Sequence, residues 1–303
     1  MAISRAQLVK ELEPGLNALF GLEYKQYENQ HSEIYTSESS DRAFEEEVML
    51  SGFANAQVKG EGSGVSFDEA QETFSARYTH ETVALAFAIT EEAIEDNLYD
   101  RIASRYTKAL ARSMSNTKQV KAVEPLINGL PTTDGFDSGD GVALFSTAHP
   151  TIAGTYKNTL SAQADLNETS LEQSLIDIAA MTDERGLRIA ARGVKMIIPS
   201  KLQFTAERLM KSQGRTATAD NDINAIASMG MIPQGYRVNN YLTDDDAFYI
   251  ITDVPNGMKM FNRAPLTTAM EGDFDTGNVR YKARERYSFG VSDPRGIFGT
   301  EGA

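Results

Sequence analysis

A single long run of alternating residues restricts the folds that this chain can adopt. Between Val65 and Ile89, apolar side chains fall first on even and then on odd positions: Phe74, Ala76 and Tyr78, followed by Val83, Leu85, Phe87 and Ile89. A period of two predicts a β-strand with one buried face, and the change of parity predicts that this face switches between Thr79 and Thr82. Such a strand would span roughly 50 to 80 Å, so part of it should project beyond the body of the fold.

The segment before this strand supplies a partner for it. Phe44–Val58 is also strand-like, and a short tip separates the two segments: Lys59, Gly60, Glu61, Gly62, Ser63 and Gly64. The glycines allow the positive φ angles that a chain reversal needs, so residues 43–89 are predicted to form a long hairpin. A phosphate-binding loop is the weaker interpretation, because no Lys-Ser or Lys-Thr follows, no helix begins there and Glu61 would repel a phosphate.

A long helix is predicted directly after the hairpin. Thr90 is a typical N-cap residue, and Glu91 and Glu92 suit the positive end of the helix dipole. Apolar residues then repeat every four positions at Ile94, Leu98, Ile102, Tyr106 and Leu110. If the helix extends to about Thr117 it is roughly 40 Å long, comparable to a small domain. It would serve as the spine of the fold.

The N-terminal residues have a weaker pattern. Ser4–Phe20 begins with a capping-box pattern at Ser4 and Gln7, which predicts a short helix that Pro14-Gly15 interrupts. Tyr24–Asp41 has no helical or strand period and little that could build a core. Residues 1–42 are therefore predicted to form an extended arm that becomes ordered against neighbouring molecules.

The chain after Pro125 has a mixed pattern of helices and strands. Its predicted elements are helix Leu171–Arg185, strand Val194–Ile198, helix Ser200–Ser212 and strand Ala247–Val254. The C-terminal strand Val279–Val291 has an apolar face and a basic face, and the basic face carries Arg280, Lys282, Arg284, Arg286 and Ser288. These elements predict a second domain followed by a two-faced strand.

The four cations of that strand have three possible roles. They could contact DNA phosphates, remain solvated, or pair with acidic residues of the arm and hairpin, among them Glu45, Glu46 and Glu47. We favour the third role, because opposite charges that are segregated along one chain can meet between subunits and fix their register.

The composition excludes several functional classes. A net charge of −14 argues against a free-standing nucleic-acid binder and keeps many identical copies soluble. The absence of cysteine excludes disulfides and thiolate metal sites. No run of about 18 apolar residues and no secretory signal is present, so neither membrane insertion nor export is predicted. The protein is expected to remain in the cytoplasm where it is made.

Candidate catalytic and metal-binding residues are few. The three histidines, His31, His80 and His149, are dispersed and form no metal-ligand motif, and Asp244–Asp246 indicates a solvated turn. Ser146 lies close to His149, as in a nucleophilic site, but the sequence offers no identifiable orienting acid or oxyanion turn. We predict no catalytic, metal or cofactor site and keep a hydrolase that uses His149 as an alternative.

Several motifs resemble segments of phage capsid proteins. Asp140–Pro150 (DGVALFSTAHP), followed by Asn158, looks like a segment of Mu-type major head subunits, as do Glu95–Tyr99 (EDNLY) and Ile197–Ser200 (IIPS). The order of arm, glycine-tipped hairpin, spine helix, α/β domain and basic strand resembles the Hong Kong 97 phage-type capsid fold. The resemblance extends over nearly the whole chain and implies an α+β fold.

Matched by position, the resemblance implies five segments: residues 1–42 as the N-terminal arm, 43–89 as the E-loop hairpin with a P-domain strand, 90–130 as the spine helix of the P-domain, 131–264 as the A-domain, and 265–303 as strands that return to the P-domain. The hairpin tip, Lys59–Gly64, would then contact neighbouring subunits.

The same resemblance implies a structural function. The chain would be the major capsid protein of a tailed phage, assembled in the host cytoplasm from hexamers and pentamers into an icosahedral virion shell around double-stranded DNA. Its expected partners are copies of itself, a separate scaffolding protein, a portal and, in some shells, a decoration protein, with little specific binding to the enclosed DNA. An encapsulin-type compartment for a cargo enzyme is the first alternative, and a tail-tube component is a lesser one.

Overall fold

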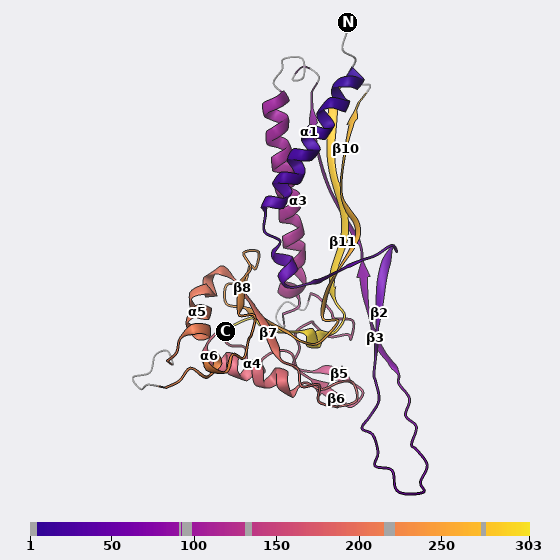
Figure 1. Cartoon of the computed structure of the whole chain (residues 1–303), viewed down its shortest axis with the longest axis vertical. Coiled ribbons are helices and arrows are strands. Elements are labelled where there is room, and N and C mark those ends of the chain that lie inside the picture. Colours follow the sequence, from indigo (N-terminus) through magenta and orange to yellow (C-terminus); the bar gives the residue numbers. More distant parts are fainter. Residues whose placement is uncertain (1–4, 91, 93–98, 131–134, 215–221, 274–276) are drawn as a thin grey trace.

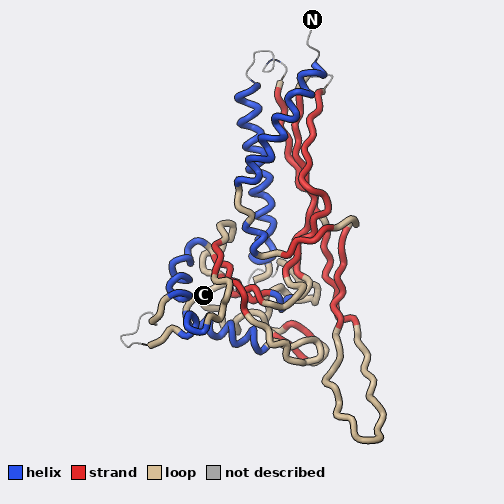
Figure 2. Tube along the Cα trace, viewed as in Figure 1, coloured by secondary structure: helices blue, strands red, loops and turns tan. Residues whose placement is uncertain are grey.

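The described part of the chain has an α+β fold, as predicted. The computed structural model describes residues 5–90, 92, 99–130, 135–214, 222–273 and 277–303, and these contain two separate four-stranded sheets. Figure 1 and Figure 2 show a tall part, in which helices stand beside long strands, and a base at one end that holds the second sheet. A hairpin projects past the base.

The tall part is a sheet with helices on one face. Its strands lie in the order β1 (Thr36–Ser39), β10 (Met258–Gly272), β11 (Val279–Val291) and β4 (Glu81–Ile89), and only β1 and β10 are parallel. The helices are α1 (Arg5–Gln26) and α3 (Tyr99–Asn128), which contact each other and the sheet. Their shared core includes Leu16, Phe20, Leu110, Met114 and Tyr281.

Helix α1 corrects the prediction for the N-terminal residues. It continues through Pro14 and ends at Gln26 rather than Phe20. Burial of Leu16 and Phe20 against the tall part offsets the backbone hydrogen bond that Pro14 lacks. The 3-10 turn η1 (Gln30–Glu33) follows, and then Ile34 and Tyr35 are buried in a core of the same chain. The expectation that this segment contributes little to a core was wrong; Ser4 lies outside the described residues.

Helix α3 extends beyond Thr117, the approximate end that its apolar periodicity predicted. The predicted start falls on Glu91 and residues 93–98, which lie outside the described residues, and α3 is described from Tyr99 onward. It passes Thr117 and includes Pro125, because Ala122, Val123 and Leu126 are buried where the tall part meets the base.

The predicted hairpin has shorter strands than expected. β2 (Phe44–Leu50) pairs with β3 (Glu72–Thr79), and residues 51–71 form a loop instead of continuing the strands. Residues 52–72 are all exposed, so no buried face holds them in a strand register. The buried face switches where the chain leaves β3 at His80 and enters β4 in the tall sheet: Ala76 and Tyr78 are buried in β3 and Ile89 is buried in β4. Leu85, which was predicted to share the buried face of β4, is 47% exposed.

The base is built around the second sheet. Its strand order is β12 (Ile297–Thr300), β9 (Phe248–Thr252), β7 (Gly193–Ile198) and β8 (Tyr236–Val238), with β7 and β8 parallel. The surrounding helices are α4 (Glu168–Ala180), η2 (Ser200–Leu202), α5 (Gln203–Lys211) and α6 (Ala225–Met229). The helix predicted at Leu171–Arg185 begins and ends earlier, since Asn167 caps it in a reciprocal pair with Ser170.

The C-terminal segment divides between the two sheets. β11 has the bounds that its alternation predicted, Val279–Val291. The turn η3 (Pro294–Gly296) then leads into β12, which pairs with β9 of the base, although residues 265–303 were assigned together to the P-domain. β10 also begins at Met258, before the boundary at residue 264, because it pairs along its length with β11. The assignment of these segments to capsid domains stays a prediction.

One hydrophobic core connects the tall part to the base. It contains Ile34 and Tyr35 from the N-terminal segment, Leu126 from α3, Tyr249 from β9, and Tyr287 from β11. A second core lies inside the base between its sheet and helices. We call these the joining core and the base core. Because residues from both ends of the chain share the joining core, the tall part and base should unfold together.

Candidate functional site

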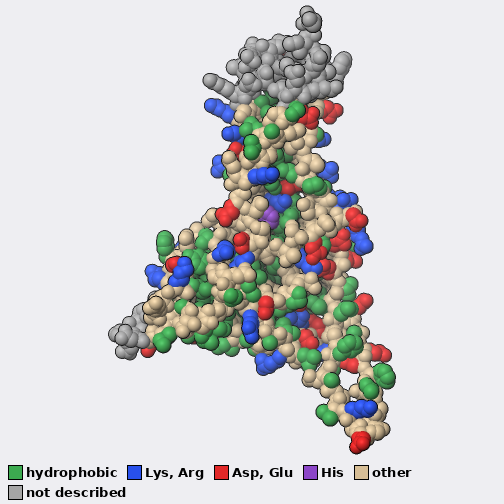
Figure 3. All heavy atoms as spheres, viewed as in Figure 1, with side chains coloured by type: hydrophobic (Ala, Val, Ile, Leu, Met, Phe, Trp, Pro, Cys, Tyr) green, Lys and Arg blue, Asp and Glu red, His purple; other side chains and the backbone are tan. Residues whose placement is uncertain are grey.

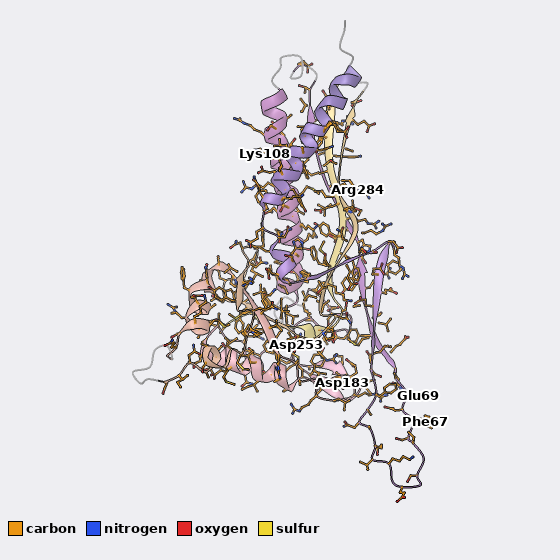
Figure 4. All side chains as sticks on the ribbon, in the orientation of Figure 1. Phe67, Glu69, Lys108, Asp183, Asp253 and Arg284 are labelled. Atoms are coloured by element: carbon orange, nitrogen blue, oxygen red, sulfur yellow. The ribbon has the colours of Figure 1, made fainter. Side chains whose placement is uncertain are left out.

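The hairpin loop is exposed throughout. Residues 52–72, which include the predicted tip Lys59–Gly64, are all solvent-exposed. Val58 is 100% exposed and Phe67 is 97% exposed. Figure 3 shows apolar side chains along this projection, and Figure 4 labels Phe67 on the loop. Large apolar side chains on a projecting loop are typical of a surface that another molecule covers.

Buried polar groups attach the paired strands of the hairpin, β2 and β3, to the tall sheet. Lys259 on β10 donates to Glu47 on β2 at 2.5 Å and lies 3.2 Å from Glu38 on β1. Burial lowers the pKa of Lys259, but the two carboxylates outweigh it, so its pKa lies above the usual value. The ring nitrogens of His80 lie 2.9 Å from the hydroxyl oxygens of Ser40 and Ser288. Contacts with the tall sheet therefore set the direction of the hairpin.

A further contact holds the loop beside the base. Arg185 donates to the carbonyl oxygen of Glu69 at 2.5 Å, and its guanidinium lies 3.6 Å from the carboxylate of Asp68. Asp183 accepts hydrogen bonds from the backbone N–H groups of Arg185 and Leu187, which shapes the turn that presents Arg185. Figure 4 shows Glu69 and Asp183 on the same side of the molecule. Arg185 thus holds the C-terminal end of the loop, at Asp68 and Glu69, against the base.

The acidic residues predicted to pair between subunits have partners within the chain. Glu45 lies 3.9 Å from Arg42, Glu46 lies 3.7 Å from Arg77, and Glu47 binds Lys259. The first two pairs include well-exposed side chains, and such pairs contribute little. Glu46 can therefore exchange its partner at low cost. Glu45 also accepts a hydrogen bond from the hydroxyl of Ser40 at 2.7 Å, and Glu47 binds a buried lysine.

The basic face of β11 is open to solvent. Arg280 pairs with Asp273 at 2.5 Å, Lys282 and Arg284 are exposed, and Arg286 is half-buried. Ser288, which was predicted to share this face, is buried against His80. The structure does not bring the basic and acidic sets together within one described chain, so pairing between subunits stays a prediction.

His149 lies in a buried network rather than an open site. Its Nδ1 is 2.6 Å from Asp140 Oδ2, its Nε2 is 2.9 Å from Asn158 Oδ1, and the side chain is 0% exposed. The hydroxyl of Ser146 accepts from the backbone N–H of Ala148. Since both ring nitrogens already have protein partners and no solvent reaches the ring, this geometry does not favour the hydrolase alternative.

The described residues also contain no ready metal site. Within them, no group of three or more histidine, aspartate or glutamate side chains could hold a metal ion. Over the same residues, none of the helices has the length and apolar character needed to cross a membrane.

A family comparison decides what kind of protein has this geometry. The family model for phage capsid proteins matches residues 73–299, from strand β3 to strand β12. The chain belongs to the phage capsid protein family. The match includes the tall sheet except β1, and it includes the base. No curated protein is detectably similar to this capsid protein in sequence.

Solved structures show the same fold at low sequence identity. A virus-like particle from Pyrococcus furiosus is 9% identical with a TM-score of 0.56, and the alignment covers 95% of this capsid protein and 98% of that chain. The capsid of Myoviridae Phage XM1 is 12% identical with a TM-score of 0.54, covering 89% of each chain. Microbacterium phage Oxtober96 is 11% identical with a TM-score of 0.52, covering 90% of this chain and 91% of that chain. These similarities confirm the capsid-type fold that the sequence motifs implied.

Sequence reasoning missed several residues that organise the surfaces of this capsid protein. Lys259 stands among apolar and polar neighbours in β10, and Arg185 was placed inside a helix, so neither showed its contact with the hairpin. Asp140 and Asn158 belong to the motif that carried the resemblance, but its spacing did not reveal that both bind His149.

Proposed function

We propose that this capsid protein is the major shell subunit of a tailed phage, and that its hexamers and pentamers form an icosahedral virion shell around double-stranded DNA. The observation that carries the proposal is the exposed apolar loop, which projects from a body that matches the phage capsid protein family. A subunit with such a projection can reach its neighbours by repeated heterologous contacts, which close into rings. The protein then needs neither a catalytic site nor a cofactor.

In this proposal the hairpin loop forms the principal inter-subunit contact. Lys59–Gly64 and the apolar residues around the tip would lie on a neighbouring subunit, where Val58 and Phe67 become buried. Arg280, Lys282, Arg284 and Arg286 would form the complementary basic surface, because they stand on an open face of β11. Their partners would be Glu45 and Glu46 of another copy; Glu47 would stay with Lys259 and act within its own chain.

The remaining partners follow from the same proposal. Shell assembly in the host cytoplasm would involve a separate scaffolding protein, a portal and, in some shells, a decoration protein. The net charge of −14 supports an inner surface that encloses DNA without binding it specifically.

A protein compartment is the second candidate function. The alignment with the virus-like particle covers 98% of that chain. The fold is therefore compatible with a closed phage shell and with a closed protein compartment. The test is to purify particles from cells that contain the complete set of phage genes and to measure their contents. Nuclease-protected double-stranded DNA supports the phage shell, whereas particles that hold one cargo protein and no DNA would replace it with the compartment.

A further inference from the structure

The three histidines of the chain lie in contrasting hydrogen-bond environments. His31 and His149 are both buried, but their ring nitrogens face different partners. Because a neutral imidazole has one donor and one acceptor nitrogen, the identity of each partner reveals how many protons the ring carries. This reasoning applies where the orientation of a neighbouring amide is fixed by its other hydrogen bonds.

The amide of Asn158 can have only one orientation. Its Nδ2 donates to the carbonyl oxygens of Leu144 at 2.7 Å, Pro294 at 3.1 Å and Ile297 at 3.4 Å. Its Oδ1 accepts from the backbone N–H of Ser146 at 2.9 Å. An exchanged amide would set an NH₂ group against that N–H and an oxygen against three carbonyl oxygens. The atom that faces His149 Nε2 is therefore an acceptor, and Nε2 must carry a proton.

The second ring nitrogen of His149 also faces an acceptor. Nδ1 lies 2.6 Å from Oδ2 of Asp140, whose other oxygen accepts from the hydroxyl of Ser138 and the backbone N–H of Val142. Burial raises the pKa of Asp140, but the hydrogen bonds from His149 and Ser138 outweigh this effect and hold its pKa below the usual value. A carboxylate at this position requires a proton on Nδ1 as well.

We infer that His149 is a doubly protonated imidazolium in the folded protein and forms a buried ion pair with Asp140. The charged groups around it agree with this assignment. The ring stacks on Tyr156 with centroids 4.9 Å apart, and Arg295 covers the same Tyr156 ring at 4.4 Å. Tyr156 is thus contacted by two cations, a favourable arrangement for an aromatic ring.

Carboxylates outnumber cations in this cluster. Arg295 is paired with Glu184 and with Asp293, and His149 is paired with Asp140. With His149 protonated, two cations face three carboxylates; with His149 neutral, Arg295 alone would balance them. A surplus of buried negative charge favours retention of this proton within the His149–Asp140 pair.

The position of this ion pair gives it a structural role. Asn158 contacts Leu144 and Ile297, which belong to the joining core, while Tyr156 and its neighbours belong to the base core. The hydrogen bonds of protonated His149 therefore connect residues of the joining core with residues of the base core.

Nitrogen-15 NMR of the full-length protein labelled at histidine tests the inference at pH 8. Only three histidines contribute, and the variants His31→Gln and His80→Gln assign their signals. We expect both ring nitrogens of His149 to show one-bond couplings to protons. His31 is the internal control: Gln119 Oε1 accepts from the His31 backbone N–H, so Gln119 Nε2 donates to His31 Nδ1, which should lack a proton.

The variant Asp140→Asn provides the second arm. It removes the charge but keeps a side chain of nearly the same shape, so at pH 8 one nitrogen of His149 should lose its proton while the His31 signals stay unchanged. If the variant does not fold, the wild-type spectrum still decides the question. A wild-type His149 with one unprotonated ring nitrogen at pH 8 would overturn the inference.

Discussion

A buried ion pair in the tall part illustrates how single residues hold the subunit together. Lys118 on α3 lies 3.3 Å from Glu285 on β11, and the hydroxyl of Tyr24 on α1 donates to the same carboxylate. Burial raises the pKa of Glu285 above the usual value, although Lys118 and Tyr24 oppose this effect. Three elements that are distant in sequence therefore meet at one charge.

We predict that Lys118→Met destabilises the subunit by about 3 kcal/mol, because it leaves the Glu285 carboxylate buried without its cation. Chemical denaturation of the unassembled subunit measures this loss. The matched control is Lys121→Met, on the same helix, which breaks partly exposed pairs with Glu81 and Glu124 and should cost less than about 1 kcal/mol. Equal losses in the two variants would contradict the account.

His31 gives a prediction for acid stability. Burial and the nearby Lys118 lower its pKa to about 4. The unfolded chain therefore binds this proton at a higher pH than the folded chain does, and stability should fall by up to about 3 kcal/mol between pH 6.5 and pH 4. The variant His31→Asn, which keeps an acceptor for Gln119, should lose less stability over the same range. Parallel pH profiles for the two proteins would refute this.

At the scale of elements, changes in the exposed loop should affect assembly without affecting the stability of the folded chain. Because Val58 and Phe67 contact little within their own chain, the double variant Val58→Ser and Phe67→Ser should change unfolding free energy by less than about 0.5 kcal/mol. The same variant should fail to form large particles, since it removes the apolar surface that we propose another subunit covers. Sedimentation velocity and thermal unfolding, measured together, test both halves. Normal particles from this variant would argue against the loop contact.

The sequence predicted those elements whose residues alternate between a buried and an exposed face. β11 has its predicted bounds, and the face switch occurs at His80, because a period of two is a local property. The hairpin strands were predicted too long, because the sequence does not show that nothing packs against residues 52–72. Helix α1 was predicted too short, because the contacts that stabilise it beyond Pro14 come from α3 and β11.

The candidate site was predictable only where its residues are contiguous. The tip Lys59–Gly64 was found because glycine spacing indicates a reversal. The contact of Lys259 with Glu47 joins residues on β10 and β2 that are far apart in the chain, and neither has a distinctive neighbour pattern. The partners of His149 were likewise hidden, although both lie within the motif that resembles phage capsid proteins.

For the whole molecule, the arrangement of charge predicts how copies recognise each other. If the proposed pairing between copies holds, reversing one charge, as in Arg284→Glu, should weaken assembly, because two carboxylates would then face each other at that position. The compensating variant Glu46→Lys in the same chain should restore it, since every interface would regain an opposite pair. Particle yield at low and moderate salt measures this exchange. Failure of the second change to restore any yield would show that Glu46 is not the partner.

The central claim is that this capsid protein closes into a shell through contacts of its projecting hairpin. The most direct measurement is cryo-electron microscopy of particles formed when the protein is expressed with the complete set of phage genes. The account predicts closed icosahedral particles in which residues 52–72 of each subunit lie against a neighbour and Phe67 is buried. Open tubes, a persistent monomer, or closed particles in which the loop touches no other subunit would contradict it.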